Sequence, residues 1–158
     1  MVSFGLVWGI LAGGCAKQSD DDMSCPVPPT EQIAGSSGSA LVFKPDPAMA
    51  AKNSTLSPHE DLDPYRTEVQ LSRLTGKGIL AGQYVDVRTK RGLKNCGEQY
   101  GALSPTNEFK YSEKDPRFQE AMAYYFGDSY QSALDDAGVE VARKPIHVVA
   151  HCMADDKL

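Results

Sequence analysis

The sequence predicts an α+β fold made of short antiparallel strands, one long amphipathic helix and a closing β-strand. Residues 65–74 alternate between apolar and polar side chains, which is typical of a half-buried strand. Residues 115–138 repeat apolar side chains at spacings of three and four, which is typical of a helix with one buried face. Residues 146–152 (IHVVAHC) alternate again and predict a strand. A chain of 158 residues has room for one domain of modest size.

Composition limits the classes of partner. The chain carries 16 Lys and Arg against 21 Asp and Glu, a formal net charge of −5, and it has no basic block. Nucleic-acid binding requires clustered Lys and Arg side chains that neutralise phosphates, so the sequence predicts no nucleic-acid partner. The hydrophobic share of 41% and the charged share of 23% are those of an ordinary folded domain.

The first fifteen residues predict an export signal. Residues 2–14 are apolar or small apart from one Ser, and Cys15 follows. This run is shorter than the roughly 20 residues that a membrane-spanning helix needs, but it fits the apolar region of a signal peptide. Leu11-Ala12-Gly13-Gly14-Cys15 resembles the lipobox of bacterial lipoproteins, which implies lipidation of Cys15 and an anchor in the outer membrane or at the cell surface. The alternatives are an ordinary cleaved signal on a secreted protein and a buried segment.

Residues 16–39 predict a flexible tether between the signal and the folded part. They contain three consecutive Asp residues, a Pro pair and a Gly-Ser tract, and they lack apolar periodicity. Folded sequence is therefore expected from Ala40 onward, as a β-rich region over 40–111 followed by a helix and a strand over 112–158.

The β-rich region contains three predicted strands. Residues 40–43 (ALVF) are a short apolar strand that ends before two prolines, and residues 48–64 predict a loop. The alternating strand at 65–74 places Thr67, Val69 and Leu71 on one face. A glycine turn at 75–78 then predicts that residues 79–87 return as its partner strand.

The predicted helix has recognisable ends. Asp115 is expected to cap the free amides of the first turn, with Pro116 at the first helical position, and Gly138 is expected to end the helix. Gly127 in its interior is a flaw that costs about 1 kcal/mol relative to Ala. The apolar stripe is expected to comprise Phe118, Met122, Tyr125 and Ala133, with Ala121, Phe126, Tyr130 and Leu134 beside it.

The closing strand carries a histidine pair that invites a metal-site interpretation. His147 and His151 have the spacing of the HExxH zinc helix, but Val148 replaces the Glu that would activate water. On a strand, residues four apart lie about 13 Å from each other, too far to bind one ion. Cys152 and His151 are adjacent and would point to opposite faces, which excludes a Cys–His nucleophile. We therefore predict neither metal ligands nor catalytic residues here.

The remaining candidates are carboxylate pairs and cysteines. Asp135-Asp136 and Asp155-Asp156 have no companion groups and are interpreted as surface charge. In an oxidising compartment, Cys25, Cys96 and Cys152 are candidates for a disulfide whose pairing the sequence leaves open. Their spacing contains no CxxC element, so a zinc ribbon is excluded.

Several segments, taken in order, carry a resemblance to a known family. They are FKPDP at 43–47, GILAGQYVDV at 78–87, FKY at 109–111, DPRFQEAMAYY at 115–125 and IHVVAH at 146–151. This order resembles the region that precedes the zinc motif in secreted bacterial metallopeptidases of the fungalysin and thermolysin type. The resemblance implies that residues 112–158 correspond to the start of a catalytic domain. It also implies that zinc and its ligands belong to a downstream part, so no catalytic or metal residue lies in this chain.

Three functional hypotheses follow. The first is the N-terminal part of an exported lipoprotein that resembles a zinc metalloendopeptidase and is not catalytic as it stands. Its partners would be the membrane, through the lipid, and the rest of its own catalytic domain; the chain would then be an incomplete domain. The alternative is a stand-alone exported lipoprotein with a small binding role or a prodomain-like shielding role. An inactive relic of the peptidase is a third option.

Overall fold

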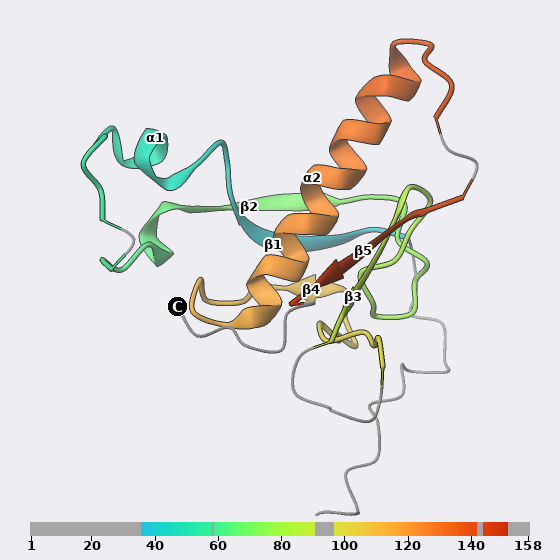
Figure 1. Cartoon of the computed structure of the whole chain (residues 1–158), viewed down its shortest axis with the longest axis horizontal. Coiled ribbons are helices and arrows are strands. Elements are labelled where there is room, and N and C mark those ends of the chain that lie inside the picture. The colour runs from blue at the N-terminus through green and yellow to red at the C-terminus, as the bar shows by residue number, and fades with distance from the viewer. Residues whose placement is uncertain (1–35, 58, 91–96, 142–143, 152–158) are drawn as a thin grey trace, which may run out of the picture.

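One long helix crosses two small β-sheets in this protein (Figure 1). The structure is a computed structural model, and it describes residues 36–57, 59–90, 97–141 and 144–151. Within this part of the chain, helix α2 (Pro116–Asp136) contacts strands of both sheets. The fold belongs to the α+β class with one long helix, as the sequence predicted.

The first sheet has the strand order β2–β1–β4. Strand β1 (Gly38–Phe43) pairs antiparallel with β2 (Arg66–Leu71), placing Ala40 opposite Val69. The two-residue β4 (Glu108–Phe109) pairs parallel with the start of β1. Strands were therefore correctly predicted near 40–43 and 65–74, although β1 begins inside the segment expected to be a tether.

The faces of β2 follow the predicted alternation only in part. Val69 and Leu71 are buried, whereas Thr67, which was expected beside them, is exposed. The first half of β2 therefore lies at the border of the core.

The second sheet corrects the predicted hairpin. Strand β3 (Val85–Thr89) does not pair with β2; it pairs parallel with β5 (Ile146–Ala150), with Val85 opposite Ile146. After the glycine turn the chain returns only as isolated bridges, such as the one between Leu74 and Gly82. The turn signal was local and correct, but the strand that follows the turn pairs with β5, and β2 has only β1 beside it among the described strands. Two of the three strand pairings are between distant segments, and two are parallel, so the sheets are not simply antiparallel.

The region 48–64, expected to be a loop, contains two short helices. Helix α1 (Pro47–Ala51) is capped by the Asp46 side chain, which accepts a hydrogen bond from the Met49 amide at 2.9 Å. A single 3₁₀ turn follows at Asp63–Tyr65. Neither of these short helices contains a buried residue, so the sequence shows no apolar periodicity from which they could be predicted.

Helix α2 begins and ends where the sequence predicts. The Asp115 side chain accepts the Arg117 amide at 2.9 Å, and Pro116 occupies the first turn. At the other end Gly138 has φ +75°, and the Val139 amide donates to the Leu134 carbonyl at 2.9 Å. These are the bonds of a Schellman motif, in which glycine takes the left-handed position.

The buried face of α2 differs from the predicted stripe. Its buried residues are Phe118, Glu120, Ala121, Tyr124 and Asp128. Phe126 and Tyr130, expected beside the apolar stripe, are 42% and 63% exposed. The helix therefore turns the carboxylates of Glu120 and Asp128 inward. Apolar spacing alone would place both of them in solvent.

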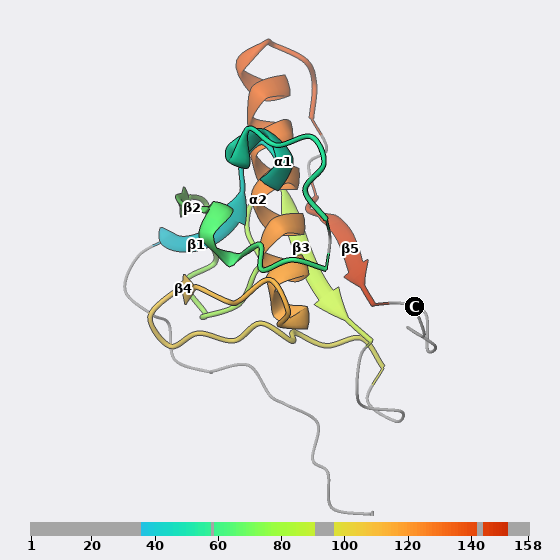
Figure 2. The ribbon, with the colours of Figure 1, turned by 90° about the vertical axis from the view of Figure 1, so that its left-hand side faces the viewer.

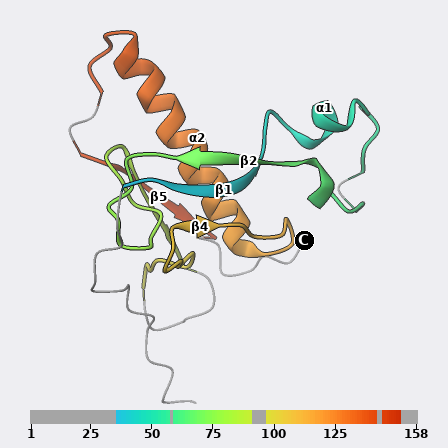
Figure 3. The same cartoon turned by 180° about the vertical axis from the view of Figure 1, so that it is seen from behind.

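The core lies between α2 and the strands. Figures 2 and 3 show from the side and from behind how α2 crosses the strands of both sheets. The buried members of the core come from both sheets, from the loops that follow β2 and β3, and from α2. They are Ala40, Val42, Val69, Leu71, Leu74, Leu80, Tyr84, Val85, Val87, Ala102, Phe109, Ala121 and Tyr124.

Candidate functional site

Strand β5 forms an edge of the second sheet. Among the described residues its sheet neighbour is β3 alone, so within that part of the chain its other edge has no strand partner. An open edge presents unpaired backbone N–H and C=O groups, which are a template for another strand. The strand itself is apolar apart from His147 and is only partly covered.

Exposed apolar side chains are concentrated in the second half of the described sequence. Four of the five large exposed hydrophobic residues of the described chain lie between positions 126 and 146: Phe126, Tyr130, Val139 and Ile146. The fifth, Met49, lies on α1. We call these four side chains and the open edge of β5 the 126–146 surface. Exposed apolar groups mark an interaction site when they form a contiguous patch.

A polar cluster holds α2 to the segment that follows β2. Arg73 donates two hydrogen bonds to the Asp128 carboxylate, at 3.1 and 2.6 Å, and its guanidinium lies 5.3 Å from the centre of the Tyr84 ring. The Tyr84 hydroxyl donates to Asp135 at 2.7 Å, and this bond raises the pKa of Tyr84. The Tyr124 hydroxyl donates to the Ser72 carbonyl at 3.1 Å. Each of these groups has a partner inside the protein, which indicates a structural clamp.

Glu120 is a carboxylate buried between α2 and the loop that follows β3. Its side chain is 2% exposed, and Oε2 accepts the Ala102 amide at 2.8 Å. Burial raises the pKa of Glu120, while the amides of Ala102 and Gly101 and the charges of His151 and Arg117 oppose that rise. This residue was not among the sequence candidates.

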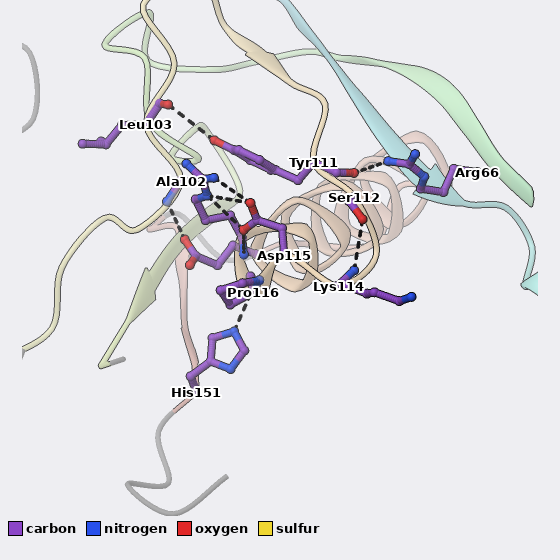
Figure 4. A network of polar contacts seen from close by, with 11 residues as sticks. Arg66, Ala102, Leu103, Tyr111, Ser112, Lys114, Asp115, Pro116 and His151 are labelled. Atoms are coloured by element: carbon purple, nitrogen blue, oxygen red, sulfur yellow. Dashed lines mark hydrogen bonds and ion pairs between the residues drawn. The ribbon is translucent and has the colours of Figure 1, made fainter. Parts of the chain in front are cut away.

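The two histidines of the closing strand do not converge. The Nε2 atom of His147, a residue of β5, lies 3.1 Å from Glu98 Oε2. The His151 Nε2 atom lies 3.1 Å from the Pro116 carbonyl oxygen at the start of α2 (Figure 4), so this nitrogen carries the proton. Within residues 36–57, 59–90, 97–141 and 144–151, no three His, Cys, Asp or Glu side chains are grouped to hold a metal ion. The described residues do not fit a zinc site.

Comparisons with known proteins were made at the level of sequence and of structure. Family models, curated proteins and solved structures gave no match.

The other predicted candidates are divided between described and undescribed parts. Asp135 accepts the Tyr84 hydroxyl, and Asp136 is exposed at the end of α2. Outside the described residues lie the signal, the tether over 16–35, Asp155-Asp156 and all four cysteines, namely Cys15, Cys25, Cys96 and Cys152. None of the helices in the described part of the chain combines the length and apolarity needed to cross a bilayer.

The buried carboxylates lie at regular positions along α2. Glu120, Tyr124 and Asp128 recur at intervals of four, and Ala121 lies beside them, so all four share one helical face. Apolar spacing alone selects the neighbouring stripe, which is why the sequence analysis did not find these carboxylates.

Proposed function

We propose that this chain is the N-terminal part of an exported, lipid-anchored protein similar to zinc metallopeptidases of the fungalysin and thermolysin type. In this proposal Cys15 carries the lipid, residues 16–37 tether the folded part to the membrane, and α2 and β5 belong to the start of a catalytic domain. The proposal rests on the order of the segments that resemble this family.

The structural observation that supports the proposal is the edge of β5 that has no strand partner among the described residues, together with the exposed apolar side chains of the 126–146 surface. A domain presents such an edge and such side chains when a further strand or helix normally covers them. In the proposed whole protein, polypeptide beyond residue 158 supplies that cover. Burial of these side chains would add to stability at about 25 cal/mol per Å² of apolar surface.

The chain as it stands is proposed to be without peptidase activity. Hydrolysis by a zinc enzyme requires a metal with three protein ligands and a base near the bound water. His147 and His151 bond to Glu98 and to the Pro116 carbonyl, so neither side chain is directed toward a common ion. Zinc would enter only with ligands from the proposed downstream part.

The intact mass of the native product tests this proposal. The product is isolated with an antibody raised against the exposed side of α2 and is examined by mass spectrometry. A mass far above 17.1 kDa, the mass of this chain, together with bound zinc, is the expected result. Incorporation of labelled fatty acid that is abolished in Cys15→Ser is expected for the lipid anchor.

A mass at or below 17.1 kDa would contradict the peptidase part of the proposal. It would favour the second candidate function, a stand-alone lipoprotein that binds a partner or shields a protease cleft as a prodomain does. The same 126–146 surface favours this candidate, because a binding module also needs an exposed apolar face and an open strand edge.

A further inference from the structure

The segment that follows α1 carries a motif that the proposed function does not use. Asn53-Ser54-Thr55 is an Asn-X-Ser/Thr triplet, the acceptor motif for sugar attachment in exported proteins, and the sequence contains this motif once. Matches to three residues also arise by chance, so the motif alone assigns no site. The exposure and the geometry of the Asn53 side chain are the further observations that an acceptor site requires.

The triplet lies in an exposed turn. Residues 52–55 are all exposed, and they follow the end of α1, where Lys52 has a left-handed φ of +53°. In Figures 1 and 3, α1 and the segment after it project on the side of the molecule opposite to β5. A bulky sugar chain on Asn53 would therefore extend into solvent and would leave the edge of β5 uncovered.

Hydrogen bonds hold Asn53 in this turn. Its Oδ1 atom accepts the Thr55 amide at 3.0 Å and the Thr55 hydroxyl at 2.8 Å, which makes an Asx turn. Its backbone amide donates to the Ala48 carbonyl at 3.0 Å, and its carbonyl accepts the Leu56 amide at 3.3 Å. None of these four bonds uses Nδ2, the atom that a sugar would join.

Thr55 connects the motif with the geometry. The triplet requires a hydroxyl group two positions after the Asn, and here that hydroxyl donates to the carboxamide oxygen of Asn53. Because a carboxamide shares electron density between its oxygen and its nitrogen, a hydrogen bond accepted by the oxygen makes the N–H protons easier to remove. The turn therefore presents an exposed Asn53 whose side-chain oxygen is engaged by the hydroxyl that the motif demands.

We propose that Asn53 is the attachment site of an N-linked glycan, which is transferred from a lipid diphosphate carrier on the far side of the membrane that the chain crosses. In this transfer, Asn53 Nδ2 forms a bond to the anomeric carbon of the sugar, and the bond from that carbon to the diphosphate oxygen breaks. The electron pair of the broken bond leaves with the lipid diphosphate, and one amide proton passes to a base of the transferase. The chain supplies only the acceptor.

This inference rests on the export that is part of the proposed function, because the motif is modified in exported proteins. The two are measured separately. Cell fractionation shows whether the product leaves the cytoplasm, and peptide analysis shows whether it carries sugar. An exported product without sugar at Asn53 overturns the glycan proposal alone, whereas a product that stays in the cytoplasm overturns both.

Mass spectrometry of the native product provides the test. The full chain is isolated from its source and digested into peptides, before and after treatment with peptide-N-glycosidase. This enzyme removes an N-linked sugar and converts the acceptor Asn to Asp. We expect a sugar-bearing peptide that contains Asn53 before treatment, and the same peptide with aspartate at this position afterwards. A peptide that is unmodified in every preparation overturns the proposal.

Three variants of the full chain, produced in the same source, test recognition of the triplet. Asn53→Gln displaces the acceptor amide, and Thr55→Val removes the hydroxyl but keeps the backbone N–H, so each should abolish the glycan. Ser54→Ala is the matched control, since it preserves the Asn-X-Thr pattern and should keep the glycan. All three positions are exposed, so the fold should persist, as circular dichroism would verify. A glycan that persists in Asn53→Gln, or that is lost equally in Ser54→Ala, overturns the proposal.

Discussion

Arg73 has an unusual backbone conformation that its side-chain contacts support. Its φ is +60°, a left-handed value that is costly for a residue other than glycine. The bidentate bond to Asp128 and the packing over the Tyr84 ring hold the residue in this state. The Asp128 side chain is 6% exposed and that of Arg73 is 30% exposed, so the ion pair is partly shielded from water. This residue-scale contact joins the chain after β2 to the middle of α2.

Asp128→Asn is expected to lower the free energy of unfolding by about 1–2 kcal/mol. The change replaces one charge-assisted hydrogen bond from Arg73 by an unfavourable contact between an Arg73 N–H donor and the new amide N–H₂ group. The partial exposure of Arg73 to water reduces the free-energy cost of this contact. Urea unfolding followed by circular dichroism measures it. Asp136→Asn is the matched control and should change stability by less than about 0.5 kcal/mol. Equal effects of the two variants would mean that the clamp does not stabilise the fold.

At the scale of single elements, α2 shows why a locally unfavourable residue is present. Gly127 weakens the isolated helix, but a Cβ atom at this position would lie 2.9 Å from Val85 Cγ2 on β3. The helix and strand approach each other closely at this point, and the missing side chain makes that approach possible. The flaw seen in the sequence is therefore a packing requirement of the second sheet.

Gly127→Ala is expected to destabilise the protein by about 1–3 kcal/mol, because overpacking against Val85 outweighs the gain in helix propensity. Ser129→Ala, on the exposed side of the same helix, should instead stabilise it slightly through propensity. Thermal unfolding of both variants gives the comparison. The cause is tested by making Gly127→Ala in a Val85→Ala background. The loss of stability caused by Gly127→Ala, measured against Val85→Ala alone, should be smaller there. Stabilisation by Gly127→Ala alone would contradict the close approach.

At the scale of the whole molecule, the exposed apolar groups are unevenly distributed along the chain. One side of α2 and the strands cover the core, while Phe126, Tyr130, Val139 and Ile146, which lie between the second half of α2 and the start of β5, are exposed. The outer faces elsewhere carry ion pairs, such as Lys110 with Glu68 at 2.8 Å. This asymmetry is the whole-molecule basis of the proposed function.

Tyr130→Lys combined with Ile146→Lys is expected to reduce binding of the dye ANS to the folded chain by more than half. The two substitutions place charges on the 126–146 surface, whose side chains are already exposed, so folding should persist. Dye fluorescence is measured alongside circular dichroism. Met49→Lys, which charges the 65% exposed side chain on α1, is the control and should leave most of the fluorescence. An equal decrease in both variants would show that the dye does not report on this surface.

Much of the local structure could be predicted from neighbouring residues. Asp115 and Pro116 identified the start of α2, and Gly138 identified its end, because capping depends on backbone groups only a few positions away. The alternation that places Val69 and Leu71 on one face of β2 was recognised because it too depends on residues that are close in sequence. Strand partners could not be predicted in this way, since β3 and β5 are separated by more than fifty residues and no turn connects them.

The sequence by itself determined the α+β class, the extent of α2 and the position of three strands in the described chain, because these depend on local periodicity and capping. Only the tertiary structure decided that β3 pairs with β5, that Glu120 and Asp128 face inward, and that β5 has no strand partner other than β3 among the described residues. A buried carboxylate is stable only when distant groups meet it, such as Arg73 for Asp128 and the Ala102 amide for Glu120. Those partners come together when the chain folds, and their spacing along the sequence does not reveal them.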